Sequence, residues 1–367
     1  MNAPTSSSTD EAITSLVETY HSLNIPTITE LNEPPSPLEF MRFVARNRPF
    51  VVRSGCAAWR ATRKWDAAYL RKTMGERLVN VAITPRGNAD AVLFEDDERE
   101  EDKSEEASAA PSPPPPGAAM FVKPLETPER FSDFLDHVQA QELEPSPAPS
   151  SPSPPGPNLI YPKEAENNNL PDEYAPLAGD VERDIAWARI ALERHEGPDA
   201  VNVWIGNSRS VTALHRDNYE NVYCQIVGRK RFVLLPPVEV ACVNETRLVS
   251  ATYIWKEVDD DERTKGGEEG EEEKNKKKKT KTELVPCLDH PITTIPFPTW
   301  DPDRPEEHPT RFSHLSRPMR VELGPSDMLY LPALWYDMEF SGVFHSASSF
   351  IRDVSLPALG EESTGLL

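Results

Sequence analysis

The sequence predicts a mainly β domain with flanking helices, and two observations support this prediction. Short segments rich in β-branched and aromatic residues recur along the chain, and Gly, Pro, Asn or Asp bounds each of them, as in 221–227 and 231–237. Gly228 lies between these two segments and predicts a hairpin turn. Many short antiparallel strands joined by turns are typical of a jelly-roll or cupin-type double sheet, the double-stranded β-helix. The mouth of such a closed shape is free to take a small ligand.

The first predicted element is a helix, and strands follow it. Apolar residues recur at helical spacing from Ile13 to Tyr20, which predicts a helix over 10–23 with Thr9 or Asp10 as its N-cap. Strands are predicted at 48–55, 78–85, 201–206, 221–227, 231–237, 320–324 and 328–332.

Three segments of the chain are predicted to be solvated inserts. Residues 95–117 pass from acidic to proline-rich, 144–157 are Ser/Pro-rich, and 256–283 carry an acidic block followed by a lysine run. None of them has enough apolar side chains to offset the entropy of ordering the chain. We therefore expect one domain over 1–367 that carries three inserts.

Charge and cysteine usage exclude several classes of protein. The net charge of −22 argues against binding to nucleic acid and favours a basic partner segment. The four cysteines show no paired spacing, which suits reduced thiols inside a cell, and no stretch is apolar enough to predict a membrane span. The lysine run 276–279 could serve as a nuclear targeting signal, but the acidic residues beside it would screen its charge. We therefore expect a cytoplasmic protein, with the nucleus as second choice.

One triple of residues has the chemistry of a metal site. His215 and Asp217 form H-x-D, and residues two apart in an extended strand share a face. An imidazole and a carboxylate from one strand, with a second imidazole from a distant strand, make the facial triad that holds Fe(II). Alone the triple is a weak signal, because a surface turn can carry the same residues.

Three further residues lie at informative distances from the triple. Lys230, fifteen residues after His215, begins a predicted strand and could neutralise the far end of a dicarboxylate. Thr212, three residues before His215, would add a hydroxyl to that carboxylate, and Asn221, four after Asp217, would point an amide at the same ligand. Each alone is more often a structural residue, but their combined spacing is far more specific than the triple.

With these motifs the chain resembles the Jumonji-C 2-oxoglutarate oxygenases, and among them the small intracellular lysyl hydroxylases of the bifunctional peptidase and lysyl hydroxylase type. The resemblance covers nearly the whole chain outside the inserts. Its segments are LNEPPSPLEFMRFVARNRPFVVRSG (31–55), KWDAAYLRKTMG (64–75), VNVAITPRGNADAV (79–92), the block 201–237, DMLYLPALW (327–335) and YDMEF (336–340).

The resemblance implies two cofactors, Fe(II) and 2-oxoglutarate, and the residues that hold them. His215 and Asp217 carry over as iron ligands, and Lys230 and Thr212 as anchors of 2-oxoglutarate. The implied reaction converts 2-oxoglutarate to succinate and CO2 while a substrate C–H bond is hydroxylated, and the cofactors supply its difficult chemistry.

Three more positions match the cosubstrate pocket of the family: Trp204, Asn221 and, more loosely, Tyr161. No Ser-His-Asp or Cys-His set stands out in the sequence. Peptidase activity, which the name of the subfamily suggests, therefore has no support in these residues.

The third iron ligand is absent from the sequence. In the family the P-x-x-W segment runs on at once to histidine, whereas here Trp335 is followed by Tyr336 and Asp337. Residues 336–340 resemble a segment that comes later in the family, so about fifteen residues are missing, the length of a short strand pair with its turn. This predicts a double sheet that lacks part of one late strand pair and has an unpaired edge.

Three explanations of the gap remain open. An exon left out of the gene model is the favoured one, because both flanks match the family. A catalytically dead paralogue is the second. The third is a rewired site in which Asp337 or His345 binds the metal, although Asp337 would place a second anionic ligand on iron.

The sequence thus leaves two classes of function. One is an Fe(II)- and 2-oxoglutarate-dependent hydroxylase that acts on a lysine side chain of a basic protein; the resemblance implies a translation-associated GTP-binding protein, with histone tails a weaker choice. The other is a noncatalytic protein-binding module, which the absent histidine favours. The C-terminal segment 348–360 resembles a family helix that pairs protomers, so a homodimer is a further expectation.

Overall fold

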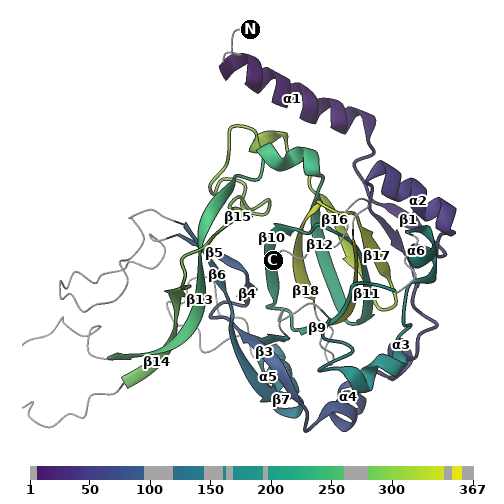
Figure 1. Ribbon diagram of the computed structural model, residues 1–367, viewed down its shortest axis with the longest axis vertical. Coiled ribbons are helices and arrows are strands. Elements are labelled where there is room, and N and C mark those ends of the chain that lie inside the picture. Colours follow the sequence, from purple (N-terminus) through teal and green to yellow (C-terminus); the bar gives the residue numbers. More distant parts are fainter. Residues whose placement is uncertain are drawn as a thin grey trace, which may run out of the picture.

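The computed structural model describes residues 6–94, 119–143, 160–162, 168–192, 197–259, 280–342 and 349–357. Two of the expected inserts, 95–117 and 144–157, lie outside the described residues. The third, 256–283, was expected to be a solvated loop, but its described ends form strands. β13 (Glu245–Asp259) and β14 (Thr280–Leu288) pair in antiparallel register from Ala251↔Leu288 to Asp259↔Thr280 and form an arm beside the main body (Figure 1).

Two sheets face each other and form the predicted double-stranded β-helix. The first has the order β1-β2-β17-β11-β19-β9 and the second the order β16-β12-β18-β10-β4 (Figure 1). The strands are β1 (Thr29–Leu31), β2 (Phe50–Val52), β4 (Asn88–Ala89), β9 (Ala200–Gly206), β10 (Val211–Arg216), β11 (Tyr219–Val227), β12 (Arg229–Leu235), β16 (Met319–Leu323), β17 (Met328–Leu331), β18 (Tyr336–Gly342) and β19 (Ser349–Pro357). All strands predicted in 201–237 and 320–332 are present.

The core between the two sheets is made by side chains that alternate along the strands. Phe232 and Leu234 of β12 are fully buried against Leu329 of β17 and Tyr223 of β11. Gly228, with φ of 77°, joins β11 to β12 in a backbone conformation that disfavours residues with a β-carbon. The turn thus fixes which residues of β12 point into the core.

The late strand pair differs from the expectation drawn from the gap. β18, which begins directly after Trp335, pairs with β10 on one side and with β12 on the other. β19 lies between β11 and β9 in the facing sheet. Both edges of β18 are therefore paired. The segment that follows the gap fills a strand position in the sheet, and the expected unpaired edge is not found at β18. The same finding corrects the expected C-terminal helix, since residues 349–357 form β19.

Two smaller sheets and six helices complete the described part of the chain. One sheet has the order β7-β3-β8, and the other has the order β14-β13-β6-β5 with β15 on β13. Their remaining strands are β3 (Leu78–Ile83), β5 (Ala91–Phe94), β6 (Ala119–Lys123), β7 (Leu125–Arg130), β8 (Ile160–Pro162) and β15 (Thr294–Pro298). The helices are α1 (Ser6–Leu23), α2 (Pro37–Arg46), α3 (Arg60–Lys64), α4 (Ala67–Met74), α5 (Phe131–Leu143) and α6 (Ala186–Ala191).

The first helix is longer than predicted and is anchored by two polar side chains. α1 begins at Ser6 rather than at Thr9 or Asp10, and Asp10 instead pairs with Arg311 at 2.8 Å. Near its end, Nε2 of His21 lies 3.1 Å from a carboxylate oxygen of Glu239. These contacts hold α1 on the short segments 237–241 and 313–315 that adjoin the double sheet.

Two further expectations concern membranes and thiols. None of the described helices is long and apolar enough to span a membrane. None of the four cysteines forms a disulfide in the described part of the chain, and Cys56, Cys224 and Cys242 are buried. Free thiols fit the expectation of a reducing environment, which stays a prediction.

A pH dependence follows from Glu239, whose side chain is fully buried. Burial, partly offset by hydrogen bonds from Ser316 and from the amide of Arg317, raises the pKa of Glu239 from 4.5 to about 7. The folded chain then binds this proton more tightly than the unfolded chain does. The contribution of protonated Glu239 to the free energy of unfolding is present in full below pH 4.5, and it is lost as the pH rises through about 7.

We therefore expect the substitution Glu239→Gln to flatten this part of the stability curve. The difference in unfolding free energy between the two proteins should change by about 3 kcal/mol between pH 4.5 and pH 7, in the direction of lost wild-type stability. Urea unfolding at several pH values measures it. Parallel curves for the two proteins would contradict the prediction.

Candidate functional site in the double sheet

The inner face of β18 carries two acidic side chains. Asp337 lies opposite His215 of β10 and Leu234 of β12, and Glu339 lies opposite Thr212 and Phe232. Because side chains alternate along a strand, both carboxylates point between the two sheets. Their neighbours Tyr336 and Met338 pack on the other face, in a separate apolar cluster with Leu214 and Val233.

The turn before β18 is fixed from two sides. The amide of Leu334 donates a 2.7 Å hydrogen bond to the carbonyl of Asp217, and Nε1 of the buried Trp335 donates to Oδ1 of Asn47 at 2.6 Å. Leu334 has a φ of 68°, a conformation that costs a residue with a β-carbon about 1–3 kcal/mol and persists only where its surroundings hold it. The turn thus ties the start of β18 to the backbone of Asp217.

His215 faces carboxylates instead of a second imidazole. Its Nε2 lies 3.9 Å from Oδ1 of Asp337, and its Nδ1 lies 3.0 Å from the carbonyl of Ala213. Burial alone would lower the pKa of His215, but the charges of Asp337, Asp217 and Glu339 outweigh it and raise the pKa. The imidazole is therefore favoured in its protonated form, in which it is a hydrogen-bond donor only.

Asp337 is the most isolated polar group of the site. Its side chain is fully buried, and neither carboxylate oxygen has a hydrogen-bond partner. Burial raises its pKa, and the nearby carboxylates of Glu339 and Asp217 act in the same direction, against the imidazole of His215. A buried carboxylate of this kind is stable only when it is protonated or balanced by a cation.

Asp217 lies one residue beyond the end of β10 and is half-buried. Its Oδ2 accepts a 3.0 Å hydrogen bond from Nδ2 of Asn221, one of the predicted pocket residues. Asn221 therefore orients Asp217 in this structure. The side-chain oxygen of Asn221 is buried without a hydrogen-bond partner.

Lys230 and Thr212 meet at one carboxylate, and that carboxylate belongs to the chain itself. The ammonium of Lys230 pairs with Oε2 of Glu339, which also accepts a 3.4 Å hydrogen bond from the hydroxyl of Thr212. Lys230 and Glu339 are 6% and 7% exposed, so the pair is almost fully desolvated. Glu339 was not predicted from the sequence, although the alternation in YDMEF is a signal for a strand with two inward acidic residues.

A fourth acidic group, Asp90, approaches from the β4 edge of the double sheet. Asp90, between β4 and β5, has a φ of 54°, and burial raises its pKa. The charges of His215 and Asp217 are close enough to act on it. Acidic side chains therefore gather around His215, whereas at the other end the ammonium of Lys230 is balanced by Glu339.

The remaining predicted residues lie at the margins. Trp204 of β9 is half-buried and packs against the core that contains Phe232. The backbone of Tyr161 pairs with Ala82 in β3, and its side chain is outside the described residues. His345, a proposed substitute ligand, also lies outside them.

The residues present do not fit the two cofactors as the family binds them. Asp337 stands where a second imidazole is required, and within the described ranges no group of three or more His, Cys, Asp or Glu side chains is arranged to hold a metal ion. The anchor formed by Lys230 and Thr212 already holds Glu339. A free dicarboxylate would have to displace that side chain.

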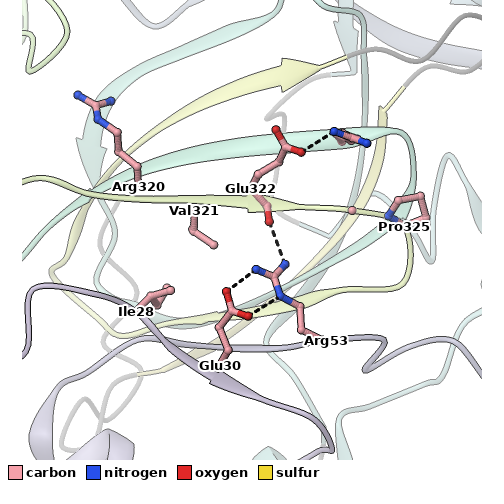
Figure 2. Close-up of a pocket in the computed structure, with 9 residues that line it drawn as sticks. Ile28, Glu30, Arg53, Arg320, Val321, Glu322 and Pro325 are labelled. Carbon is pink, nitrogen blue, oxygen red and sulfur yellow. Dashed lines mark hydrogen bonds and ion pairs between the residues drawn. The ribbon is translucent and has the colours of Figure 1, made fainter.

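A hollow of about 460 Å³ lies outside this site, between β1, β2 and β16 (Figure 2). Arginines line it, but their charges are paired. Arg53 contacts Glu30 and Asp327 at 2.6 Å each, and Arg229 contacts Glu322 at 2.8 Å. The hollow therefore offers no unpaired arginine among these two, whereas buried carboxylates without hydrogen-bond partners lie between the sheets.

The fold and these residues define a cupin-like domain. The family model described as Cupin-like domain matches residues 35–338, and the chain belongs to this family. The match runs from just before α2 into β18, so β1 and β19 of the double sheet lie outside it.

Its relatives are Jumonji-C proteins, whose family depends on Fe(II) and 2-oxoglutarate. The chain is 30% identical over 307 residues to the bifunctional peptidase and (3S)-lysyl hydroxylase JMJD7 of Homo sapiens, covering 83% of this chain and 78% of the relative. It is 27% identical over 310 residues to the JmjC domain-containing protein E of Dictyostelium discoideum, with 83% and 76% covered. It is also 27% identical over 318 residues to the lysine-specific demethylase JMJ32 of Arabidopsis thaliana, with 84% and 75% covered.

The pairing of Lys230 with Glu339 predicts a strong energetic coupling. The substitution Lys230→Met leaves Glu339 buried and unpaired, and we expect it to lower the free energy of unfolding by about 3–5 kcal/mol. The double substitution Lys230→Met with Glu339→Leu should restore most of that loss, because it buries no charge. Denaturant unfolding of the single and double variants measures the coupling.

The exposed pair Arg71–Asp136, with side chains 39% and 62% exposed, is a matched control. Its coupling should not exceed about 1 kcal/mol. If the losses at Lys230 and Glu339 simply add, the two side chains do not interact as described.

Proposed function

We propose that this protein is built as an Fe(II)- and 2-oxoglutarate-dependent protein hydroxylase for a lysine side chain, and that the chain carrying Asp337 is an inactive form of it. One observation carries this proposal: Lys230 and Thr212 hold a carboxylate on the same inner sheet face on which His215 stands opposite residue 337. In the proposed active form, His215 and Asp217 would hold iron, and Lys230 with Thr212 would hold the far carboxylate of 2-oxoglutarate.

The other predicted residues take supporting roles in this proposal. Asn221 would keep Asp217 oriented, as its 3.0 Å hydrogen bond does here. Trp204 would close one wall of the pocket, and Tyr161 would add a contact to the cosubstrate. These roles follow from the family pattern and from the places of the residues in the sheets.

The proposed substrate is a lysine in a basic protein segment. Asp90 lies near His215 and would suit an ammonium group, and the net charge of −22 suits a basic partner. The names of two relatives, a (3S)-lysyl hydroxylase and a lysine-specific demethylase, also specify lysine. A translation-associated GTP-binding protein in the cytoplasm, or alternatively in the nucleus, is the partner class that we propose. The homodimer is not carried into this proposal, because residues 349–357 form β19 inside the double sheet and not the expected pairing helix.

A noncatalytic protein-binding module is the second candidate. Two observations favour it: Asp337 replaces the third ligand, and Glu339 occupies the anchor for the cosubstrate. Such a module would bind the basic segment through the same acidic side chains and release no product.

Restoring the histidine tests the proposal directly. We expect the unmodified chain to release no succinate with Fe(II), 2-oxoglutarate and a lysine-containing basic peptide. The variant Asp337→His with Glu339→Ala should bind Fe(II), release succinate and add one oxygen atom to the peptide, as mass spectrometry would show. The same variant with His215→Ala is the control and should be inactive.

Two outcomes would count against the proposal. Succinate release by the unmodified chain would show that Asp337 serves as a ligand, which is the rewired site. A restored variant that binds iron, 2-oxoglutarate and peptide without turnover would favour the binding module.

The transcript offers an independent measurement. Sequencing the messenger RNA between the codons of Trp335 and Tyr336 should reveal an in-frame insert that encodes an aromatic residue followed by histidine. A transcript that matches the present sequence would leave the noncatalytic module as the natural function.

A further inference from the structure

Glu339 satisfies the positive charge of Lys230 in the way that a bound carboxylate ligand would. Its Oε2 receives the ammonium of Lys230 and the hydroxyl of Thr212, which is 3.4 Å away. An ammonium and a hydroxyl that converge on one oxygen form a recognition site for a carboxylate. The carboxylate here comes from the middle of β18.

Lys230 needs an anion at this place. It is 6% exposed, and its Nζ lies 5.4 Å from the ring centroid of Phe232 and 5.9 Å from that of Tyr223. The two rings offer a weak attraction to the cation but no full countercharge. An unpaired ammonium in such surroundings is costly, so a carboxylate that enters is held firmly.

Glu339 fits the anchor only in part. Its second oxygen, Oε1, is buried and has no hydrogen-bond partner. A side chain tied to a strand cannot turn to satisfy both oxygens, whereas a free carboxylate can. If the side chain of Glu339 is removed, a free carboxylate can therefore bind to Lys230 and Thr212 in its place.

We propose that Glu339 is a built-in carboxylate ligand that occupies the anchor formed by Lys230 and Thr212 and excludes free small carboxylates from the double sheet. The exclusion is competitive, because one oxygen-binding position serves both. This inference concerns binding alone and holds whether or not the protein is an enzyme.

The variant Glu339→Ala tests the inference by chemical rescue. It removes the tethered carboxylate and leaves space for acetate or for one end of 2-oxoglutarate. We expect the variant to unfold at a lower temperature than the unmodified chain, and millimolar acetate or 2-oxoglutarate to raise its unfolding temperature again. By calorimetry it should bind 2-oxoglutarate at least about tenfold more tightly than the unmodified chain does.

All measurements are made with EDTA present, so that a metal ion plays no part and failure of the hydroxylase proposal leaves this result unaffected. Glu322→Ala is the matched control, because Glu322 lies on β16, which pairs with the Lys230 strand β12, and its 46% exposed side chain pairs with Arg229. It makes the same change of charge and should show no response to carboxylates. Adding Lys230→Met to Glu339→Ala should abolish the response.

If Glu339→Ala does not fold, Glu339→Ser takes its place, since it also removes the charge and leaves space for a free carboxylate. Binding of 2-oxoglutarate by the unmodified chain as tight as by the variant would overturn the inference. So would a folded Glu339 variant with no response to either carboxylate.

Discussion

A buried positive charge at Lys230 must be balanced inside the double sheet, and β18 supplies the balancing carboxylate. This requirement fixes the register of β18 between β10 and β12. A slip of one residue would turn Glu339 out of the core and bring Met338 or Phe340 against the ammonium. The alternation of YDMEF also buries Tyr336 and Met338 in the outer cluster, so the same register satisfies both faces of the strand.

The same register has a second consequence at the metal position. With Glu339 opposite Thr212, Asp337 necessarily stands opposite His215. The strand therefore completes the fold and places a carboxylate where the family needs an imidazole. Folding and catalysis make different demands on this one strand: the fold requires a segment with two buried faces, whereas iron binding requires a particular side chain at one position.

The sequence predicted the strands whose patterns are local and missed the features that depend on distant partners. β11, β12 and β17 are β-branched or aromatic runs between turn residues, and all three were predicted. β18 was assigned by resemblance to a later segment, so its place between β10 and β12 could not be foreseen. The ends of β13 and β14 are charged and were read as loop, because a hairpin outside the main core has little buried surface to mark it.

The predicted site residues show the same division. H-x-D and the spacing to Lys230 are local features, and the structure places His215 on β10 and Lys230 on β12 of the same sheet, with β18 between the two strands. The role of Glu339 depends on the register of β18 against β10, which the sequence does not show. Thr212 and Glu339 are 127 residues apart in the chain, and only the structure shows that they share a hydrogen bond. Carboxylates gather around His215, and at the other end the ammonium of Lys230 binds a carboxylate. Because Glu339 supplies that carboxylate from within the chain, Lys230 stays neutralised in the folded state without any ligand.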